Sequence, residues 1–450
     1  MTGLARWLVV AIAVVTVPAW AGVRPRYGGT LRVAMAESLA SLDPAEPGDV
    51  VARARVTPLL FDTLVRVDAE GRGHPQLAVA WQADRSYKRW QFWLRPGVHF
   101  SDGTALTAVT VVTALSGRAE WKARVDGELV VIESEASRQG LLAELALARN
   151  AVERRGATGE LIGTGPFLIK SFVAGKSLEL AANDGSWGGR PFVDGVQIEF
   201  GKTLREQMVE LQLEKVDLIE VGAEQIGKVE SEGRKAQVSL PMELVAVVGG
   251  AGKAKELEAL SLAVDRKSIQ SVLLRGGSEA AGGVLPEWVS GTGVLFPVQV
   301  DLQRARSALR AGRPGAAVPT RPLTLSCDAG DGLGRLLADR VALNAREVGL
   351  SVQVVSSGNA DLHLERISLG SGDPGVALGE VGRAVGVKVA AGLSAPGEIY
   401  LAERKLMDDG GVVPLFHLPL ASLAGDRVKS LSAGKLGSWP IDEAWLETGP

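Results

Sequence analysis

The chain of 450 residues contains one cysteine, Cys327, and it begins with a segment typical of exported proteins. After Arg6 comes an apolar run over residues 8–17, and Ala19 and Ala21 then form a small-x-small cleavage site. The run is shorter than the roughly 20 residues that cross a bilayer, so a signal peptide over residues 1–21 is predicted instead of an anchor. With no cysteine near the cleavage site, lipid attachment is not expected, and the mature protein is predicted to be periplasmic. Without an intrachain disulfide, its stability must come from a large hydrophobic core.

Composition and charge exclude several classes of protein. Hydrophobic residues make up 46% and charged residues 22% of the chain, which is ordinary for a folded protein. The formal net charge is −3, so no general attraction to nucleic acid is expected. The four histidines lie far apart in the sequence, and one cysteine cannot build a cysteine-rich metal centre. Neither a metal site nor a cofactor is predicted.

Strand-like and helix-like segments alternate along the chain, which favours a mixed α/β protein with two sheet-bearing domains. In residues 88–95, for example, Trp90 and Phe92 alternate with Gln91 and Trp93, as in a half-buried strand. The segments predicted as strands are residues 30–34, 88–95, 128–132, 167–173, 177–181, 196–200, 216–221, 323–327, 350–355 and 412–418. The main segments predicted as helices are residues 49–65, 106–115, 137–154, 203–215, 257–264, 268–274, 302–309 and 334–348.

A series of short runs, in the same order along the chain, resembles the family 5 extracellular solute-binding proteins. These are oligopeptide and dipeptide receptors of ATP-binding-cassette (ABC) importers. The most specific run is FWLRPGVHFSDG at residues 92–103. The others are YGGTLRV at 27–33, LDP at 42–44, LFDTLV at 60–65, PQLA at 75–78 with Trp81, GTGPF at 163–167, WGGRP at 187–191 with Asn183 and Asp194, AVDR at 263–266 and VPLFH at 413–417.

The resemblance implies a type II periplasmic-binding-protein fold with two lobes, an extra subdomain in lobe one, and hinge strands between the lobes. On this chain, lobe one would span residues 22–241, with its subdomain at about 48–159, and would be completed by residues 415–450. Lobe two would span residues 242–414. The hinge crossings would lie near Val248 and Phe416.

By the same resemblance, the protein would capture a small molecule or peptide and deliver it to permease subunits of an ABC importer, as a monomer. An alternative is that the fold serves as a periplasmic sensory or interaction protein with no role in transport. No enzymatic activity is expected. Residues 249–254 lack the first glycine and the hydroxyl residue of a P-loop, and the S-x-x-K match at 432–435 has none of its companion motifs.

Five residues are candidates for ligand binding because of their positions. Glu37 and Ser38 follow the first strand, and open α/β sheets bind ligands at the carboxyl ends of their strands. Glu365 and Asp373 flank a segment that departs from the family pattern, and His417 lies on a predicted hinge strand. The alternatives are a solvated loop, exposed carboxylates, and a core histidine hydrogen-bonded to the backbone.

The departure lies at residues 366–374, RISLGSGDP. Peptide-binding members of the family hold the ligand's amino group with an aspartate in a segment like G-W-x-x-D-x-x-(D/E)-P. Here Ile367 stands at the tryptophan position and Gly370 at the aspartate position. A buried ammonium group needs an opposite charge. The resemblance therefore implies a solute receptor without the usual amine-binding aspartate.

Overall fold

The computed structural model describes residues 24–48, 50–117, 120–250, 252–274, 277–311, 321–328, 330–356 and 359–447. The predicted signal peptide lies outside these residues. Among the described residues, no helix is both long and apolar enough to cross a membrane.

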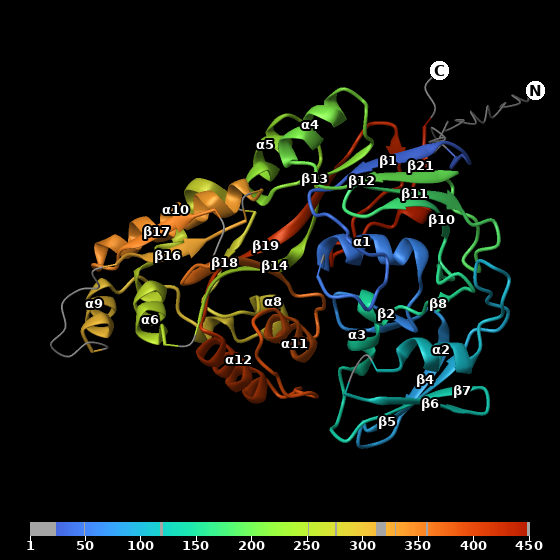
Figure 1. Cartoon of the computed structure of the whole chain (residues 1–450), viewed down its shortest axis with the longest axis horizontal. Coiled ribbons are helices and arrows are strands. Elements are labelled where there is room, and N and C mark those ends of the chain that lie inside the picture. The colour runs from blue at the N-terminus through green and yellow to red at the C-terminus, as the bar shows by residue number, and fades with distance from the viewer. Residues whose placement is uncertain are drawn as a thin grey trace, which may run out of the picture.

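One sheet of eleven strands runs through the described part of the molecule (Figure 1). Two antiparallel strands of 13 residues each, β14 (Gln237–Gly249) and β19 (Val412–Ala424), lie in its middle. One half, from the edge inwards, consists of β10 (Phe167–Val173), β11 (Ser177–Ala182), β12 (Gly195–Glu199), β1 (Thr30–Ala34) and β13 (Leu218–Val221). The other half consists of β18 (Leu362–Ser368), β16 (Leu323–Ser326) and β17 (Val352–Val355), and β15 (Glu279–Ala280) also pairs with β19.

The ladder between β14 and β19 is irregular. Its register shifts on both sides of Pro241 and again between Val245 and Ala246. Pro241 of β14 and Pro414 and Pro419 of β19 have no amide hydrogen to donate. The hydrogen-bond ladder between the two central strands is therefore less regular than that of an uninterrupted pair of 13-residue strands.

A second sheet of four strands lies apart from the large one (Figure 1). In spatial order it contains β4 (Ala78–Ala83), β5 (Arg89–Leu94), β7 (Leu129–Glu133) and β6 (Lys122–Asp126). The two-stranded pairs are β2 (Val65–Val67) with β3 (Gly73–Pro75), β8 (Arg154–Arg155) with β9 (Leu161–Ile162), and β20 (Val428–Lys429) with β21 (Trp445–Leu446).

The helices cover the sheets. They are α1 (Val50–Leu60), α2 (Ala108–Leu115), α3 (Leu141–Leu145), α4 (Leu204–Gln212), α5 (Ile226–Ser231), α6 (Ala254–Ala263), α7 (Arg266–Ile269), α8 (Glu287–Ser290), α9 (Leu302–Ala311), α10 (Gly332–Glu347), α11 (Pro374–Ala384) and α12 (Pro396–Gly410). Short turns of helix are η1 (Ala148–Asn150), η2 (Ala223–Gln225), η3 (Gln270–Leu274), η4 (Gly293–Leu295) and η5 (Ile441–Glu443).

The predicted helix over residues 137–154 is wrong, because only α3 and η1 form there. The Asn150 side chain donates a hydrogen bond to the carbonyl oxygen of Glu144 (2.7 Å), and the Val152 amide donates to the carbonyl oxygen of Asp62 (2.8 Å). These bonds turn the chain away from the helix axis. Leu145 and Val152 nevertheless reach the same apolar cluster, which explains the helix-like apolar pattern.

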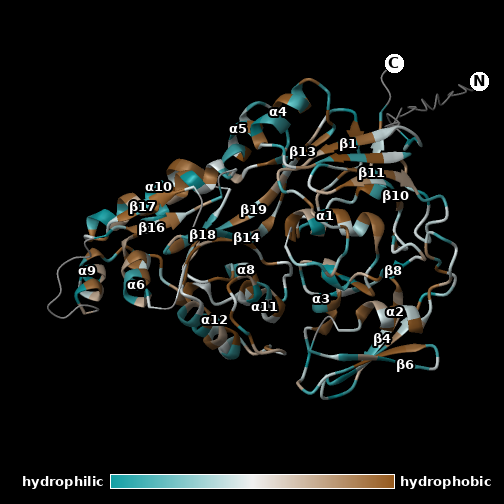
Figure 2. Ribbon diagram, in the orientation of Figure 1, coloured by the Kyte–Doolittle hydropathy of each residue, from teal (hydrophilic) through white to brown (hydrophobic). Residues whose placement is uncertain are grey.

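In the described part of the chain, buried apolar residues form four clusters, and the interior strands are mostly apolar (Figure 2). One cluster lies between α1 and the strands β1, β11 and β12, and a second lies between the four-stranded sheet, α2 and α3. We call these two clusters and their elements the N-terminal part. The other two lie on opposite faces of β14, β18 and β19, one with α6 and α10 and one with α11 and α12. We call these the C-terminal part.

Four of the family-like runs meet at Asp62, a buried residue of the LFDTLV run in the loop after α1. Its carboxylate accepts hydrogen bonds from the side chains of Gln76 (2.6 Å), Thr164 (2.7 Å) and Trp187 (2.8 Å). A buried carboxylate needs such donors because it has lost its water. These runs therefore stabilise the fold of the N-terminal part.

Glycines in the GTGPF run allow close contact with the end of α1. A Cβ atom on Gly163 would lie 1.9 Å from the carbonyl oxygen of Leu60, and one on Gly165 would lie 2.7 Å from the same oxygen. Only glycine fits at such an approach. The position of α1, which forms one wall of the cleft described next, thus depends on these residues.

Candidate functional site

A large cleft, about 2310 Å³ in volume, lies between the N-terminal and C-terminal parts. On the N-terminal side its lining includes much of α1, the loop at residues 36–38 and residues 186–190. On the C-terminal side it includes residues 364–368 of β18, the loop that leads into α10 and the cleft-facing side of α11. Because both parts contribute side chains, a molecule held in this cleft would contact both.

Arg55 projects from α1 into the N-terminal wall. Its side chain is 4% exposed and forms an ion pair with Glu220 at the end of β13. Its guanidinium carbon also lies 4.1 Å from the centre of the Trp439 ring, a cation–π contact. Glu220 accepts a second hydrogen bond from the Ala36 amide (2.5 Å). The wall therefore contains a buried charge pair whose position is fixed by three separate segments.

Arg366 of β18 is the central charge of the C-terminal wall. It forms ion pairs with Glu243 of β14 (2.5 Å) and with Asp331, the residue that caps α10 (3.4 Å). The negative charge of Glu243 raises the pKa of Arg366. Glu224 of η2 lies close enough to interact with the Arg366 guanidinium, and burial raises the pKa of Glu224. Carboxylates thus outnumber the arginine in this wall.

One ion pair connects the two walls at the edge of the cleft. Nη1 of Arg149 in η1 lies 2.5 Å from Oε1 of Glu380 in α11. The same Oε1 accepts a hydrogen bond from Arg383 (2.6 Å), one helical turn further on. All three side chains line the cleft.

Gly370 lies beside this pair and has a positive φ of 67°. A Cβ atom there would lie 3.2 Å from Cδ2 of Leu147 and 3.3 Å from Cγ of Glu380. The predicted position of the missing aspartate thus lies on the cleft lining, but neighbouring side chains already occupy the adjacent space.

Three of the five predicted ligand-binding residues, Glu37, Ser38 and Glu365, lie on the cleft lining. The Glu37 carboxylate accepts a hydrogen bond from the Ala52 amide in the first turn of α1 (2.5 Å). An anion at this position is favourable because the first amides of a helix have no partner within the helix. Glu37 therefore stabilises the start of α1, whereas Ser38 and Glu365 are exposed.

The other two, Asp373 and His417, are not among the lining residues. Asp373 caps α11 by accepting a hydrogen bond from the Val376 amide (2.9 Å), and burial raises its pKa. His417 is 3% exposed, and its Nε2 lies 3.1 Å from the carbonyl oxygen of Val284. Burial lowers the pKa of His417 to about 4. His417 is thus the core histidine considered as its alternative, whereas Asp373 is a partly buried helix cap and not the exposed carboxylate considered for it.

The sequence analysis did not select Arg55, Arg149, Arg366 or Glu380, although all four line the cleft. A signal existed for Arg55, which lies in the mostly apolar stretch VVARARVTPLL. An arginine on the buried side of a helix needs a partner. No comparable local signal marks Arg149 and Glu380, since 231 positions separate them.

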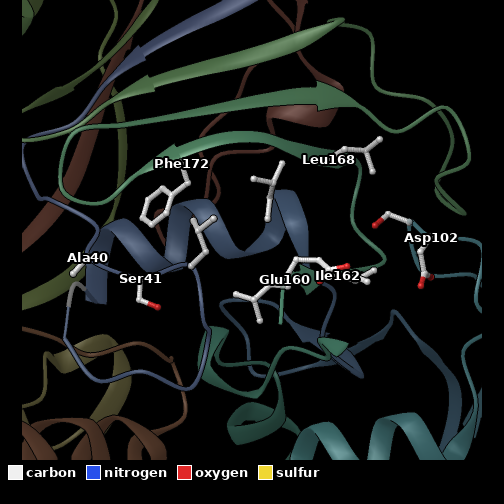
Figure 3. A pocket seen from close by; sticks show the side chains of 11 residues that line it. Ala40, Ser41, Asp102, Glu160, Ile162, Leu168 and Phe172 are labelled. Atoms are coloured by element: carbon white, nitrogen blue, oxygen red, sulfur yellow. The ribbon is translucent and has the colours of Figure 1, made fainter. Parts of the chain in front are cut away.

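A second, smaller hollow of about 660 Å³ lies at the edge of the large sheet (Figure 3). Leu168 and Phe172 of the edge strand β10 line one side of it, and Asp102 and Glu160 supply charge. Asp102 is paired with Arg154, and Glu160 accepts hydrogen bonds from Thr158. Because this hollow lies within the N-terminal part and its carboxylates already have partners, the larger cleft is the better candidate site.

A family model described as bacterial extracellular solute-binding proteins, family 5 middle, matches residues 141–382. The chain belongs to this family. This membership confirms the resemblance seen in the sequence, the two-lobed periplasmic-binding-protein fold and the function of solute binding. The two parts of the molecule that form the cleft thus belong to a fold shared by solute-binding proteins.

Individual relatives agree with this assignment. The chain is 24% identical to the nickel-binding periplasmic protein of Escherichia coli K12 over 353 residues, which cover 68% of this chain and 67% of the relative. Its fold is similar to that of NikA from Staphylococcus aureus in complex with Ni(L-His)2, with 15% identity, a TM-score of 0.78, and 93% and 100% of the two chains covered. It is also similar to the oligopeptide-binding protein AppA from Bacillus subtilis in complex with a nonapeptide, with 17% identity, a TM-score of 0.77, and 94% and 100% covered.

Proposed function

We propose that this protein captures a small polar solute in the cleft and delivers it to the permease subunits of an ABC importer in the cytoplasmic membrane. The observation that carries the proposal is the cleft itself, which is large and lined by charged side chains from both parts. The mature protein would act as a monomer in the periplasm after removal of residues 1–21. Its relatives include a nickel-binding protein and an oligopeptide-binding protein, which supports the binding of a solute by this protein as well.

We further propose that the lobes follow the boundaries expected from the sequence, with residues 22–241 and 415–450 in lobe one and residues 242–414 in lobe two. The strands β14 and β19 would then be the hinge. They pair with each other along most of their length, and β19 also pairs with β13 on one side while β14 pairs with β18 on the other. A ligand that contacts both lobes shifts the population toward the closed form.

The chemistry of the cleft supports a polar ligand. Gly370 supplies no carboxylate that could bind an amino group of this ligand, and the side chains of Leu147 and Glu380 occupy the space that an aspartate there would need. Arg55 is paired with one carboxylate, whereas Arg366 is shared by Glu243 and Asp331, so a ligand would meet a charge pair on the N-terminal side and an excess of carboxylates around Arg366 on the other. Solutes with several hydrogen-bonding groups fit such walls better than apolar ones.

The proposal can be tested with a thermal-shift screen of the purified protein, supported by native mass spectrometry. The panel would contain short peptides, opines, the nickel–histidine complex and other small polar solutes. We expect at least one class to raise the melting temperature in a concentration-dependent manner. Arg366→Gln should weaken that shift, whereas Arg335→Gln, a control on the surface of α10 outside the cleft lining, should not. If no solute stabilises the protein and none is carried through purification, solute transport would be contradicted.

A further inference from the structure

The ion pair between Arg149 and Glu380 joins elements that belong to different apolar cores. Arg149 lies in η1, between Leu145 and Val152, which pack in the core of the four-stranded sheet. Glu380 lies in α11, which is anchored through Leu378 in the core of the C-terminal part. Their side chains are 24% and 14% exposed, so the pair is partly shielded from solvent. This contact therefore crosses from one part of the molecule to the other.

Other contacts along the same seam are also polar or involve the backbone. Lys388, which follows α11, forms an ion pair with Glu120 (2.6 Å). A Cβ atom on Gly392 would lie 1.8 Å from the carbonyl oxygen of Ser137, so the two segments of the chain touch there through their backbones. Among the described residues, the apolar cluster of the four-stranded sheet and that of α11 share no member. Opening this seam would separate charges and backbone and would expose Leu147 where it faces Gly370, but it would not divide an apolar cluster.

We propose that Arg149 and Glu380 form a clasp that holds the two lobes together when the cleft contains no ligand. The proposal rests on the proposed hinge and adds a specific contact that favours the closed form. The attraction between two opposite charges weakens in salt, more so when they are partly exposed. Ionic strength would therefore set the fraction of ligand-free protein that is open and able to admit a solute.

Arg383 provides a matched control. It donates to the same Glu380 oxygen as Arg149 and is also an arginine, but it lies on α11 itself, three residues further along. Replacing Arg383 removes a positively charged partner of the Glu380 carboxylate but breaks no contact between the lobes. The clasp thus predicts opening of the lobes for Arg149→Gln and no change for Arg383→Gln.

The experiment measures the distance between the lobes in protein freed of ligand by unfolding and refolding. Spin labels on Lys122→Cys in β6 and Leu401→Cys in α12, both exposed, would report the distance by double electron–electron resonance, with Cys327→Ser as background. Circular dichroism would verify that each variant is folded.

In 20 mM NaCl, Arg149→Gln and Glu380→Gln should each raise the ratio of long to short distances roughly two- to fivefold, the range expected for a partly exposed pair. Arg383→Gln should leave the ratio unchanged. The exchanged pair Arg149→Glu with Glu380→Arg, made with Arg383→Gln to avoid adjacent arginines, should restore the short distance. In 500 mM NaCl the unchanged protein should move toward the open distribution.

Two results would overturn the clasp: the same distances for Arg149→Gln as for the unchanged protein, or equal opening in Arg383→Gln. Either outcome leaves the thermal-shift screen for solutes as a separate test, because no ligand is present in the distance measurement. Failure of the clasp is thus distinguishable from failure of the proposed function.

Discussion

Glu403 of α12 makes the stability of the protein depend on pH near neutrality. It is fully buried, and one carboxylate oxygen accepts a hydrogen bond from the Leu285 amide (2.9 Å). Burial raises the pKa of Glu403 from an ordinary value of 4.5 to about 7. The folded state thus holds this proton more tightly than the unfolded state does. Stability contributed by the neutral form is present below pH 4.5 and is lost as the pH rises to about 7 and beyond.

The size of this loss follows from the difference between the two pKa values. At about 1.4 kcal/mol per pH unit, the free energy of unfolding should decrease by ~3 kcal/mol between pH 4 and pH 8 through Glu403 alone. Glu403→Gln has nearly the same shape, keeps an oxygen for the Leu285 amide and cannot ionise. We therefore expect this variant to gain ~3 kcal/mol relative to the unchanged protein over that range.

Urea unfolding followed by tryptophan fluorescence at pH 4, 5, 6, 7 and 8 would measure the difference at each pH. Asp408→Asn, an exposed position on the same helix, serves as the control for loss of one acid from α12. Parallel stability curves for Glu403→Gln and the unchanged protein would refute the reasoning, because they would show that this carboxyl group titrates alike in the folded and unfolded states.

Three more outcomes are expected. Because burial lowers the pKa of His417 to about 4 from 6.5, the unfolded state binds the additional proton, and stability is lost as the pH falls through this window; His417→Gln should remove this loss of ~3 kcal/mol in acid urea titrations. Asp217→Ala should remove the carboxylate shared by Arg32 and Arg427, whose side chains are 32% and 44% exposed, and lower stability by about 1 kcal/mol in urea unfolding at pH 7; an unchanged midpoint would contradict this. Gly163→Ala should cost about 3 kcal/mol because its Cβ would lie 1.9 Å from the Leu60 oxygen, whereas Gly188→Ala, with nothing within 4 Å, should be neutral in the same thermal melt.

Much of the fold could be predicted because its strands carry a local signal. Trp90 and Phe92 are buried on one face of β5 while Trp93 is exposed on the other, as their alternation predicted. The predicted strand at residues 167–173 coincides with β10. At residues 137–154 a helix-like apolar pattern led to a wrong prediction of one long helix, because a hydrogen bond from a side chain to the backbone bends the chain there.

The candidate site was harder to predict because its charges are brought together by tertiary structure. Glu37 and Asp373 were selected by their position in the chain, yet each binds the first turn of a helix. Capping and ligand binding favour the same residue types at the same loop ends, so a single sequence does not separate them. Arg149 and Glu380 meet only after the two parts have packed, and nothing in either local sequence indicates the other.

The gaps in the ladder between β14 and β19 have a mechanical consequence. Three prolines and repeated register shifts leave fewer hydrogen bonds between the two strands at the middle of the sheet than a regular pair of strands would have. Twisting the two strands against each other should therefore deform few bonds there, while the regular ladders on either side stay rigid. If the lobes move, the backbone already contains a soft axis for that rotation, and replacing these prolines with residues able to donate an amide hydrogen would stiffen it.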